Sequence, residues 1–306
     1  MERPYVLHLF SPGRQVSPFD VNMAADAGYQ IIVPYVGVEL AAIAGLTQDT
    51  IFSRGPKGAA RSGIFIGGRD ALLAADMLAQ ARAAMFPPFQ VGAMADPSGA
   101  YTTAAALVAC VEAALKHHHG LPLAGRRLLV LGGTGPVGRI AGVIAAQAGA
   151  EVGLSSRHGR DAAEEAAQAT ARRFGVALRG VSGADRAALR ASLAEAELLL
   201  CCTAAGVQAV SADDLGAARS LLVAADVNAV PPSGIAGIDN LDQGRPLAGA
   251  CTGAVGIGAL AVGQIKYQTQ HRLLLQMRGA ANAPSLSFAE AYATARAVLA
   301  EASAVS

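Results

Sequence analysis

Residues 130–158 read VLGGTGPVGRIAGVIAAQAGAEVGLSSRH, and this stretch constrains the fold more than any other in the chain. The apolar run RLLVLG is typical of a strand and meets glycines spaced as GxGxxG, after which a helix rich in small residues follows. A second short strand ends at Ser155, Ser156 and Arg157. A strand, a tight glycine turn, a helix and a further strand in this order predict a βαβ unit in a parallel sheet.

The glycine turn itself predicts a dinucleotide site. In such units the first glycine permits the turn, the second lets the backbone approach a pyrophosphate, and the third allows the helix to pack closely on the strand. The N–H groups of the helix N-terminus then face the anion, and a proline suits the first helical position. The alternative is a glycine turn that serves packing alone. The turn offers the cofactor-binding candidates Gly133, Thr134, Gly135, Pro136, Val137 and Gly138.

The end of the second strand indicates which dinucleotide is preferred. An NAD-binding unit normally carries an acidic residue there to hold the adenosine ribose, but this chain has Ser155, Ser156 and Arg157. Two hydroxyls and a guanidinium are suited to an added phosphate, because arginine offers a fork of donors. We therefore predict NADP in preference to NAD. NAD binding remains an alternative, with Arg157 then a solvated loop residue.

Strand-like and helix-like runs alternate along the rest of the chain, which predicts an α/β fold of two doubly wound parallel sheets. A cluster of glycine and proline in HHHGLPLAGR marks a domain boundary. We expect a substrate domain at 1–120, braced by C-terminal helices within 259–306, and a Rossmann-type NAD(P) domain at 121–258. Short strands are expected near Thr50 and in GIFIGG. Two long helices, at 254–277 and 287–301, are expected to leave no further strand to pair.

Composition narrows the class of protein. A chain of 306 residues with 53% hydrophobic residues is long enough for two buried cores. Its net charge of +1 gives no reason to expect nucleic acid as a partner. No N-terminal export signal or long uninterrupted apolar span is apparent, so a cytoplasmic protein is expected. The spacing of the cysteines favours reduced, buried thiols over a disulfide framework or zinc ligands: Cys110, Cys201, Cys202 and Cys251.

Several longer stretches resemble one known family. SRGPKGAARSGIFIGGRD, ADPSGAYTTAAA, LGGTGPVG, DVNAVPPSGIAGID and GAVGIG occur in the order and spacing of the bacterial NAD(P)-dependent methylene-tetrahydromethanopterin dehydrogenases. The resemblance extends from about Phe19 to Gly258. It implies a two-domain subunit with its active site in the cleft, a homo-oligomer, and reduced pterin carriers of one-carbon units as substrates. Some family members also accept methylene-tetrahydrofolate.

The implied reaction is a hydride transfer. The methylene form has one carbon bridging two nitrogens, and loss of a hydride leaves a methenyl cation that both nitrogens stabilise. No proton moves, so alignment of the carbon with the nicotinamide suffices, and neither a metal nor an acid–base constellation is expected.

Substrate-binding candidates lie in the first half of the chain. Arg54 and Lys57 stand on a basic glycine loop where an anionic tail would find partners, or they are solvated. Asp96 ends a strand and is expected either to bind the pterin or to cap the next helix, with Ser98 and Thr102 beside it. Asp20 follows SPF at a helix start, where capping is the stronger interpretation and substrate binding the other.

Further cofactor-binding candidates follow the later strands. Thr203 and Ala204 end the fourth strand of the second domain, where small residues permit close approach of a ligand. Asn228 follows the fifth strand and would bind the nicotinamide amide, or it forms a turn before Pro231-Pro232. Gly256 belongs to a glycine run that opens the long helix and would face the nicotinamide or pack subunits.

One departure from the family concerns catalysis. The family carries basic residues in the helix just past the glycine run, including a lysine in the active site. Here that helix reads ALAVGQ from Ala259 to Gln264, with no lysine before Lys266. Either Lys266, named as the catalytic candidate, would reach the cleft from one turn further along, or Gln264 would substitute by hydrogen bonding. The three histidines at 117–119 point in different directions on a helix and predict a solvated helix end, not a metal site.

Other functions remain open at this level. One is a methylene-tetrahydrofolate dehydrogenase. Another is an oxidoreductase of the shikimate dehydrogenase type, which would need a lysine–aspartate pair that the sequence does not place. A third is a non-catalytic protein that binds NADP or a pterin.

Overall fold

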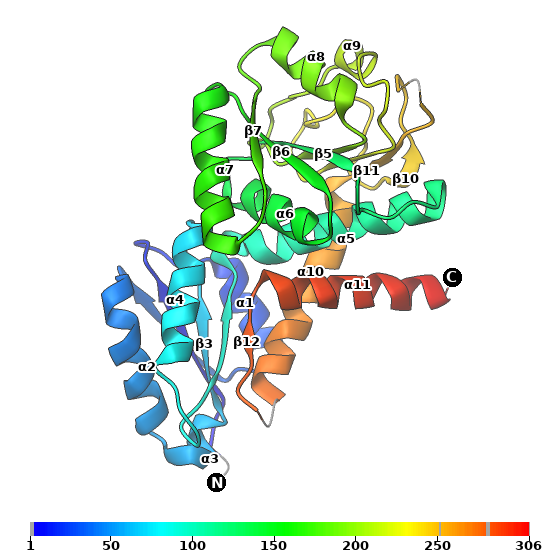
Figure 1. The fold of residues 1–306 in the computed structure, drawn as a ribbon. Coiled ribbons are helices and arrows are strands. Elements are labelled where there is room, and N and C mark those ends of the chain that lie inside the picture. Colours follow the sequence, from blue (N-terminus) through cyan, green and yellow to red (C-terminus); the bar gives the residue numbers. More distant parts are fainter. Residues whose placement is uncertain (1–2, 251, 280–281, 306) are drawn as a thin grey trace. The chain divides into compact units, whose positions relative to one another are not determined.

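A computed structural model describes residues 3–250, 252–279 and 282–305 (Figure 1). The chain packs as two compact units, the first formed by residues up to Thr102 with Tyr267–Thr294, the second by Thr103–Lys266 with the C-terminal residues from Ala295. Three helices contribute to both units: α5 (Ala100–His119), α10 (Ala259–Gly279) and α11 (Phe288–Val305). The sequence had placed the break after residue 120 and the C-terminal helices wholly with the first domain. Cys251, expected to be a buried thiol, lies outside the described residues.

The first unit contains a five-stranded sheet in the order β12-β4-β3-β1-β2, and every neighbouring pair is parallel. Its strands are β1 (Val6–Ser11), β2 (Ile31–Val36), β3 (Ser62–Ile66), β4 (Gly92–Ala95) and β12 (Ser285–Leu286). Its helices outside those shared with the second unit are α1 (Pro18–Asp26), α2 (Ile43–Phe52), α3 (Gly55–Ala59), α4 (Ala71–Ala83) and the 3-10 turns η1 (Leu40–Ala42) and η2 (Pro97–Gly99).

The second unit contains a seven-stranded sheet in the order β10-β11-β9-β8-β5-β6-β7, in which only β10 runs antiparallel to its neighbour. Its strands are β5 (Arg127–Leu131), β6 (Glu151–Ser156), β7 (Arg179–Ser182), β8 (Leu198–Cys201), β9 (Val223–Asp226), β10 (Gln243–Pro246) and β11 (Val255–Ile257). Its own helices are α6 (Pro136–Gln147), α7 (Arg160–Phe174), α8 (Arg186–Glu195) and α9 (Ala212–Leu215). The predicted α/β class with doubly wound parallel sheets is confirmed.

The strand order of each sheet reverses direction at one point. In the second sheet the chain moves outward from β5 through β6 to β7, then returns to the other side of β5 with β8. In the first sheet the reversal lies between β1 and β3. Loops part at such a switch point, and ligands of open α/β sheets bind there, beyond the carboxyl ends of the strands.

Three local predictions are wrong. The run at Thr50–Phe52 ends helix α2 instead of forming a strand, because Ile43, Thr47 and Ile51 bury one helical face. The glycine run at 253–258 contains strand β11, which pairs with β9, so the long helix begins only at Ala259. The C-terminal region does supply a further strand, since β12 pairs with β4.

Helix α5 is apolar along most of its length. Among the described residues, one helical segment, Pro97–His119, meets the length and hydropathy expected of a membrane span, and 72% of its apolar window is buried inside the protein. A buried core helix meets the same test, so this segment is weak evidence for a span. At its end His119 is half buried, with Nε2 3.1 Å from the Leu222 carbonyl oxygen, whereas a fully solvated helix end was predicted.

Candidate cofactor and substrate sites

The glycine turn after β5 is held by close backbone contacts. Gly132 has a φ of 68°, and a Cβ there would lie 2.4 Å from the Cys202 carbonyl oxygen. A Cβ on Gly133 would lie 2.8 Å from the Cα of Leu154 on β6, and one on Gly138 would lie 2.5 Å from the Gly132 oxygen. The turn conformation therefore belongs to Gly132, one residue before the glycine to which the GxGxxG pattern assigned it. Gly133 is required by the close approach of β6.

Helix α6 begins directly after this turn. Gly135 is its N-cap and Pro136 occupies the first turn, as the sequence predicted. Arg139 fixes the loop from inside the helix, because its Nε donates to the Thr134 carbonyl at 2.9 Å and its Nη1 to Thr170 Oγ1 at 3.0 Å. The first N–H groups of a helix have no partner within the helix, so they offer donors to an anion.

A pocket of about 560 Å³ opens at this turn, at the carboxyl edge of the second sheet. A Cβ on Gly135 would lie 3.3 Å from the Gly132 oxygen and would narrow the cradle at the helix N-terminus, so the bare backbone fits a pyrophosphate. Gly133, Pro136, Val137 and Gly138 shape the turn without lining the pocket. The predicted cofactor-binding residues that do line it are Thr134, Gly135, Ser155, Ser156, Arg157, Thr203 and Ala204.

The end of β6 forms one rim of this pocket. The side chains of Ser155 and Ser156 are nearly inaccessible, at 3% and 2% exposure, and Ser156 Oγ accepts the backbone N–H of His158 at 3.1 Å. Arg157 and His158 are exposed, and the Arg157 Nε donates to the His158 Nε2 at 3.3 Å. Two exposed basic side chains therefore stand where the ribose-binding acid of an NAD unit would be.

Asn228 lies outside the pocket lining, and its side chain is used by the protein itself. Its Oδ1 accepts the N–H groups of Gly206 at 3.1 Å and Val230 at 3.0 Å, and its Nδ2 donates to the Pro232 carbonyl at 3.0 Å. This geometry matches the second of the two roles predicted for Asn228, that of a residue forming the turn before Pro231-Pro232. Asn228 connects two loops, one of which carries Thr203 and Ala204 into the pocket.

Gly256 also lies away from the pocket. It is the middle residue of strand β11, it is buried, and a Cβ there would lie 3.1 Å from Ile238 Cγ1. Its role is close packing of β11 against the core of the second unit, and it does not begin a helix facing a ligand as the sequence suggested.

The buried polar groups near the pocket are structural. Asp226 at the end of β9 is 1% exposed and accepts the N–H groups of Asn228, Gly234 and Ile235. Burial raises the pKa of the Cys201 thiol to about 12, and the neighbouring Asp226 carboxylate acts in the same direction. A thiol with so high a pKa is a poor nucleophile at neutral pH.

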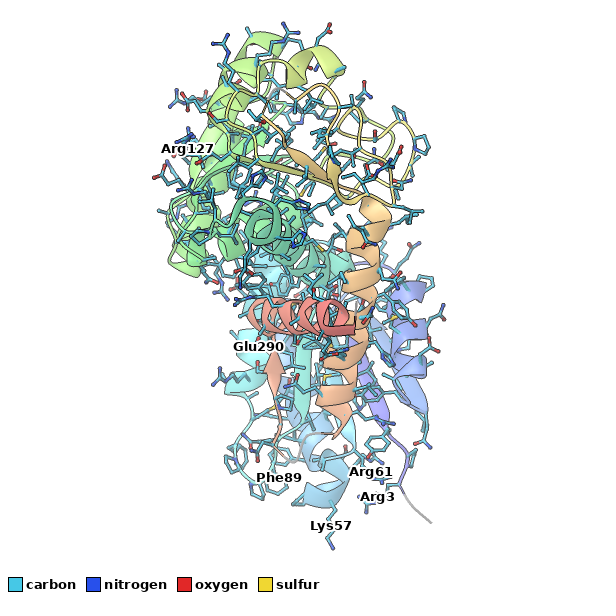
Figure 2. All side chains as sticks on the ribbon, turned by 90° about the vertical axis from the view of Figure 1, so that its right-hand side faces the viewer. Arg3, Lys57, Arg61, Phe89, Arg127 and Glu290 are labelled. Atoms are coloured by element: carbon cyan, nitrogen blue, oxygen red, sulfur yellow. The ribbon has the colours of Figure 1, made fainter. Side chains whose placement is uncertain are left out.

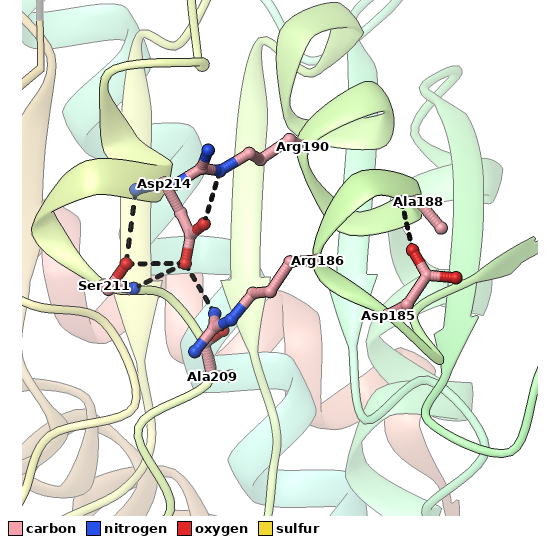
Figure 3. A network of polar contacts seen from close by, with 7 residues as sticks. All are labelled: Asp185, Arg186, Ala188, Arg190, Ala209, Ser211 and Asp214. Carbon is pink, nitrogen blue, oxygen red and sulfur yellow. Dashed lines mark hydrogen bonds and ion pairs between the residues drawn. The ribbon is translucent and has the colours of Figure 1, made fainter.

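A network of polar contacts ties α8 to α9 (Figure 3). The buried Asp214 accepts from Arg186 Nη1 at 2.5 Å and Arg190 Nε at 2.8 Å, and it forms a capping box with Ser211. Burial alone would raise the pKa of Asp214, but the hydrogen bonds from Ser211 and Arg190 and the charge of Arg186 hold that pKa below its ordinary value. This network fixes the helix that follows the pocket rim at Gly183–Asp185.

A second pocket, of about 750 Å³, lies in the first unit at the switch point of its own sheet. It is lined by the segment after β1, the segment after β3 and Ser98 after β4. Two predicted substrate-binding residues, Asp20 and Ser98, line it, whereas Asp96, Thr102, Arg54 and Lys57 do not.

Asp20 lies in the first turn of α1 and is 3% exposed, so it is not the helix cap that the sequence favoured; the N-cap is Ser17. The Asp20 Oδ1 accepts from Gln270 Nε2 at 2.9 Å, and Gln270 is fully buried on α10. A buried carboxylate with a fixed amide partner at a pocket wall is a strong candidate for binding a polar ligand ring.

Asp96 is fully buried and acts as a helix cap. Its Oδ1 accepts the N–H groups of Tyr101 at 2.9 Å and Thr102 at 3.1 Å, and its Oδ2 accepts the Thr102 hydroxyl at 2.6 Å. Of the two roles that the sequence left open for Asp96, helix capping is therefore the one that the structure shows, and Thr102 is a partner of that cap. Between them, the exposed Ser98 has a φ of 53° and donates through its hydroxyl to the Gly68 carbonyl at 2.7 Å. Strained residues of this kind cluster at ligand sites.

Arg54 and Lys57 lie at the opposite edge of the first sheet. Arg54 donates to the carbonyls of Pro4 at 2.9 Å and Arg61 at 3.2 Å, both at the amino ends of strands. Figure 2 shows Lys57 and Arg61 at the same end of the unit as Arg3. Arg54 therefore holds the amino ends of β1 and β3 together, and neither cation faces the pocket.

Two other cations line the pocket and were missed. Arg14 follows β1 and Arg69 follows β3; both are exposed, and the structure gives neither a side-chain hydrogen bond nor an ion pair with any described residue. The sequence signal that would have identified them is their position just after the carboxyl ends of two strands. The sequence prediction instead followed the more conspicuous glycine-rich loop around Arg54.

Lys266 lies on α10, one helical turn before Gln270, and is half buried. It stays the candidate for a catalytic lysine. In the described part of the chain, no group of three or more His, Cys, Asp or Glu side chains is arranged to hold a metal ion.

Two doubly wound sheets, with a glycine turn and a pocket at the switch point of the second, define an α/β protein of the Rossmann dinucleotide-binding class. Residues 18–98 match the model of the family described as methylene-tetrahydromethanopterin dehydrogenase, N-terminal. The chain is 46% identical, over 94% of its length and 96% of the relative's, to the NAD(P)-dependent methylenetetrahydromethanopterin dehydrogenase of Methylorubrum extorquens. The chain belongs to this family.

A second relative from Methylorubrum extorquens, the bifunctional protein MdtA, is 34% identical over 83% of this chain and 87% of its own. Among solved structures, shikimate 5-dehydrogenase from Listeria monocytogenes is 16% identical, with a TM-score of 0.47 and coverage of 89% of this chain and 91% of the other.

Proposed function

We propose that this protein is an NAD(P)-dependent dehydrogenase that oxidises methylene-tetrahydromethanopterin to the methenyl form in one-carbon metabolism. The observation that carries the proposal is the pocket at the switch point of the second sheet, with its bare glycine cradle at the start of α6. The 46% identity to a dehydrogenase of that name supports the same substrate and reaction.

Hydride transfer requires the protein to position the pterin and the cofactor and to exclude water. When bound, NAD(P) supplies a hydride acceptor in its nicotinamide ring. The backbone at Gly132–Gly135 would hold the pyrophosphate, and the loop at Thr203 and Ala204 would allow close approach of the cofactor. Because the hydrogen leaves the methylene carbon together with both bonding electrons, as a hydride, no side chain has to accept a proton in that step.

The pterin is assigned to the pocket of the first unit. Asp20 would accept hydrogen bonds from N–H groups of the pterin ring, since Gln270 holds its carboxylate in place from one side. Arg14 and Arg69 would bind the anionic tail of the carrier, in the role that the sequence had given to Arg54 and Lys57. Lys266 is retained as the catalytic candidate, because it is half buried on α10 one helical turn before Gln270, the partner of Asp20.

NADP is the proposed preferred cofactor because Arg157 stands at the end of β6, where an added ribose phosphate would lie. Arg157→Ala is expected to weaken NADP binding by about tenfold and NAD binding by less than about twofold, because one charge-assisted hydrogen bond to the phosphate is lost. Binding titrations with both nucleotides measure the ratio, and an unchanged ratio would show that Arg157 is only a solvated residue.

A steady-state assay tests the reaction itself. The purified chain is supplied with methylene-tetrahydromethanopterin, or with methylene-tetrahydrofolate, and either nicotinamide cofactor, and formation of the reduced cofactor is followed by absorbance. Turnover with the methanopterin substrate supports the proposal, and faster turnover with the folate would reassign the substrate. Nucleotide binding without turnover on either carrier would leave a non-catalytic binding protein.

We also propose that the protein is a cytoplasmic homo-oligomer. Large apolar side chains stand exposed on both units, including Val36 at 54%, Phe52 at 51% and Leu241 at 71%. Contacts between subunits commonly cover such residues. Light scattering coupled to size-exclusion chromatography measures the mass, and a value near 31 kDa would contradict this part of the proposal.

A further inference from the structure

The ends of β6 and β7 lie side by side at the rim of the cofactor pocket. The two strands are parallel, Ser156 pairs with Ser182, and the Gly183 N–H donates to the Ser156 carbonyl at 2.9 Å. Arg157 follows the first strand and Asp185 follows the second, and both line the pocket. The sheet thus brings a carboxylate to the rim where β6 itself has none.

A hydrogen bond to one carboxylate oxygen of Asp185 holds this side chain in place. Its Oδ1 accepts the Ala188 N–H at 2.8 Å as the N-cap of α8, and Figure 3 shows the other carboxylate oxygen without a contact to the residues drawn. Helix α8 is fixed in turn by the ion pairs of Arg186 and Arg190 with the buried Asp214. The exposed oxygen of Asp185 therefore has a defined position at the rim.

We propose that Asp185 supplies, from the loop after β7, the acid that holds the adenosine ribose hydroxyls of NAD. Arg157 and His158 serve the 2′-phosphate of NADP at the same rim. This inference rests on the proposed nicotinamide cofactor and deepens it. The pocket then accepts both cofactors because each has its own charged partner, and the balance between Asp185 and the two basic residues sets the preference.

The sign of each charge effect follows from elementary electrostatics. A carboxylate accepting from ribose hydroxyls makes charge-assisted hydrogen bonds, which favour NAD. The same carboxylate repels the phosphate at that position, which disfavours NADP. Removal of the charge at residue 185 is therefore expected to change the two affinities in opposite directions.

The test is Asp185→Asn, because asparagine caps a helix about as well as aspartate and removes only the charge. We expect the NAD dissociation constant to rise about tenfold and that of NADP to fall about twofold, measured by calorimetric titration. Asp213→Asn, a change of an exposed acid on α9 outside the pocket lining, is the matched control and should leave both constants within twofold.

Thermal unfolding of each variant shows whether the fold is kept, and Asp185→Ser, which also retains a cap, replaces the first variant if it is not. A ratio of NAD to NADP affinity that equals that of the wild type in the variant at 185 would overturn the inference. Failure of the wild-type chain to bind either nucleotide would instead overturn the proposed function, so the two failures are distinguishable.

Discussion

The side-chain oxygen of Asn228 accepts the backbone N–H of Gly206 at 3.1 Å, and this bond joins the loop after β9 to the loop after β8. The second of these loops carries Thr203 and Ala204 into the cofactor pocket. The position of the pocket wall therefore depends on an amide that does not itself line the pocket.

Asn228→Ala tests this dependence. The change leaves the N–H groups of Gly206 and Val230 without their acceptor, which is expected to lower the free energy of unfolding by about 2 kcal/mol. Cofactor affinity should fall several-fold as the loop loosens. Urea unfolding and nucleotide titration measure the two effects. Asn240→Ala, which removes one side-chain bond to the Ala229 carbonyl, is the control and should change stability by less than about 1 kcal/mol.

Asp214 makes stability depend on pH at the acid end. Its folded-state pKa is lowered, so its contribution is fully present above the ordinary aspartate pKa of about 3.9 and is lost as the pH falls through the lower folded value. Asp214→Ala is expected to cost about 2 kcal/mol at pH 7, because the hydrogen bonds that Ser211 and the two largely exposed arginines donate to the buried carboxylate are lost.

Urea midpoints of the wild type and Asp214→Asn, measured from pH 7 to pH 3, check this dependence. The difference between the two proteins should shrink toward the acid end. A difference that stayed constant over that range would mean that Asp214 does not act through its charge.

The glycines of the turn differ in what they do. Gly133→Ala would bring a Cβ to 2.8 Å from the Leu154 backbone, and we expect it to lower the free energy of unfolding by about 1–3 kcal/mol. A Cβ at Gly135 would contact the Gly132 oxygen at 3.3 Å, so Gly135→Ala should lower the melting temperature less than Gly133→Ala does, while weakening nucleotide binding at least tenfold. If Gly135→Ala bound NAD and NADP normally, the glycine turn would serve packing alone.

The cations at the two edges of the first sheet should respond differently. Arg14→Ala and Arg69→Ala are each expected to raise the KM for the pterin substrate about tenfold with little change in kcat, because each removes one charged partner of the tail. Arg54→Ala should leave KM unchanged and lower the melting temperature, because the guanidinium joins the carbonyls of Pro4 and Arg61. If Arg54→Ala raised KM and Arg14→Ala and Arg69→Ala did not, the anionic tail of the substrate would bind at the amino edge of the sheet instead.

The parts that could be predicted from the sequence depend on neighbours along the chain. The glycine turn before α6, Pro136 in its first turn and the absence of an acid at the end of β6 were all legible in one stretch of some 30 residues. Backbone sterics and the apolar pattern of strand and helix act over that range. Glycine-rich segments were less legible, since the run containing Gly256 forms a strand only because β9 and β10 lie on either side of it.

The α/β class, the dinucleotide turn and the basic rim at Arg157 can all be read from the amino-acid order. The packed fold was needed to show that Arg14 and Arg69, not Arg54 and Lys57, stand at the pocket of the first unit, and that Asp185 joins Arg157 at one rim. This is because a parallel sheet gathers the carboxyl ends of strands far apart in the chain at one edge. Local patterns identify a charged loop, but only strand order and register settle the edge at which it lies.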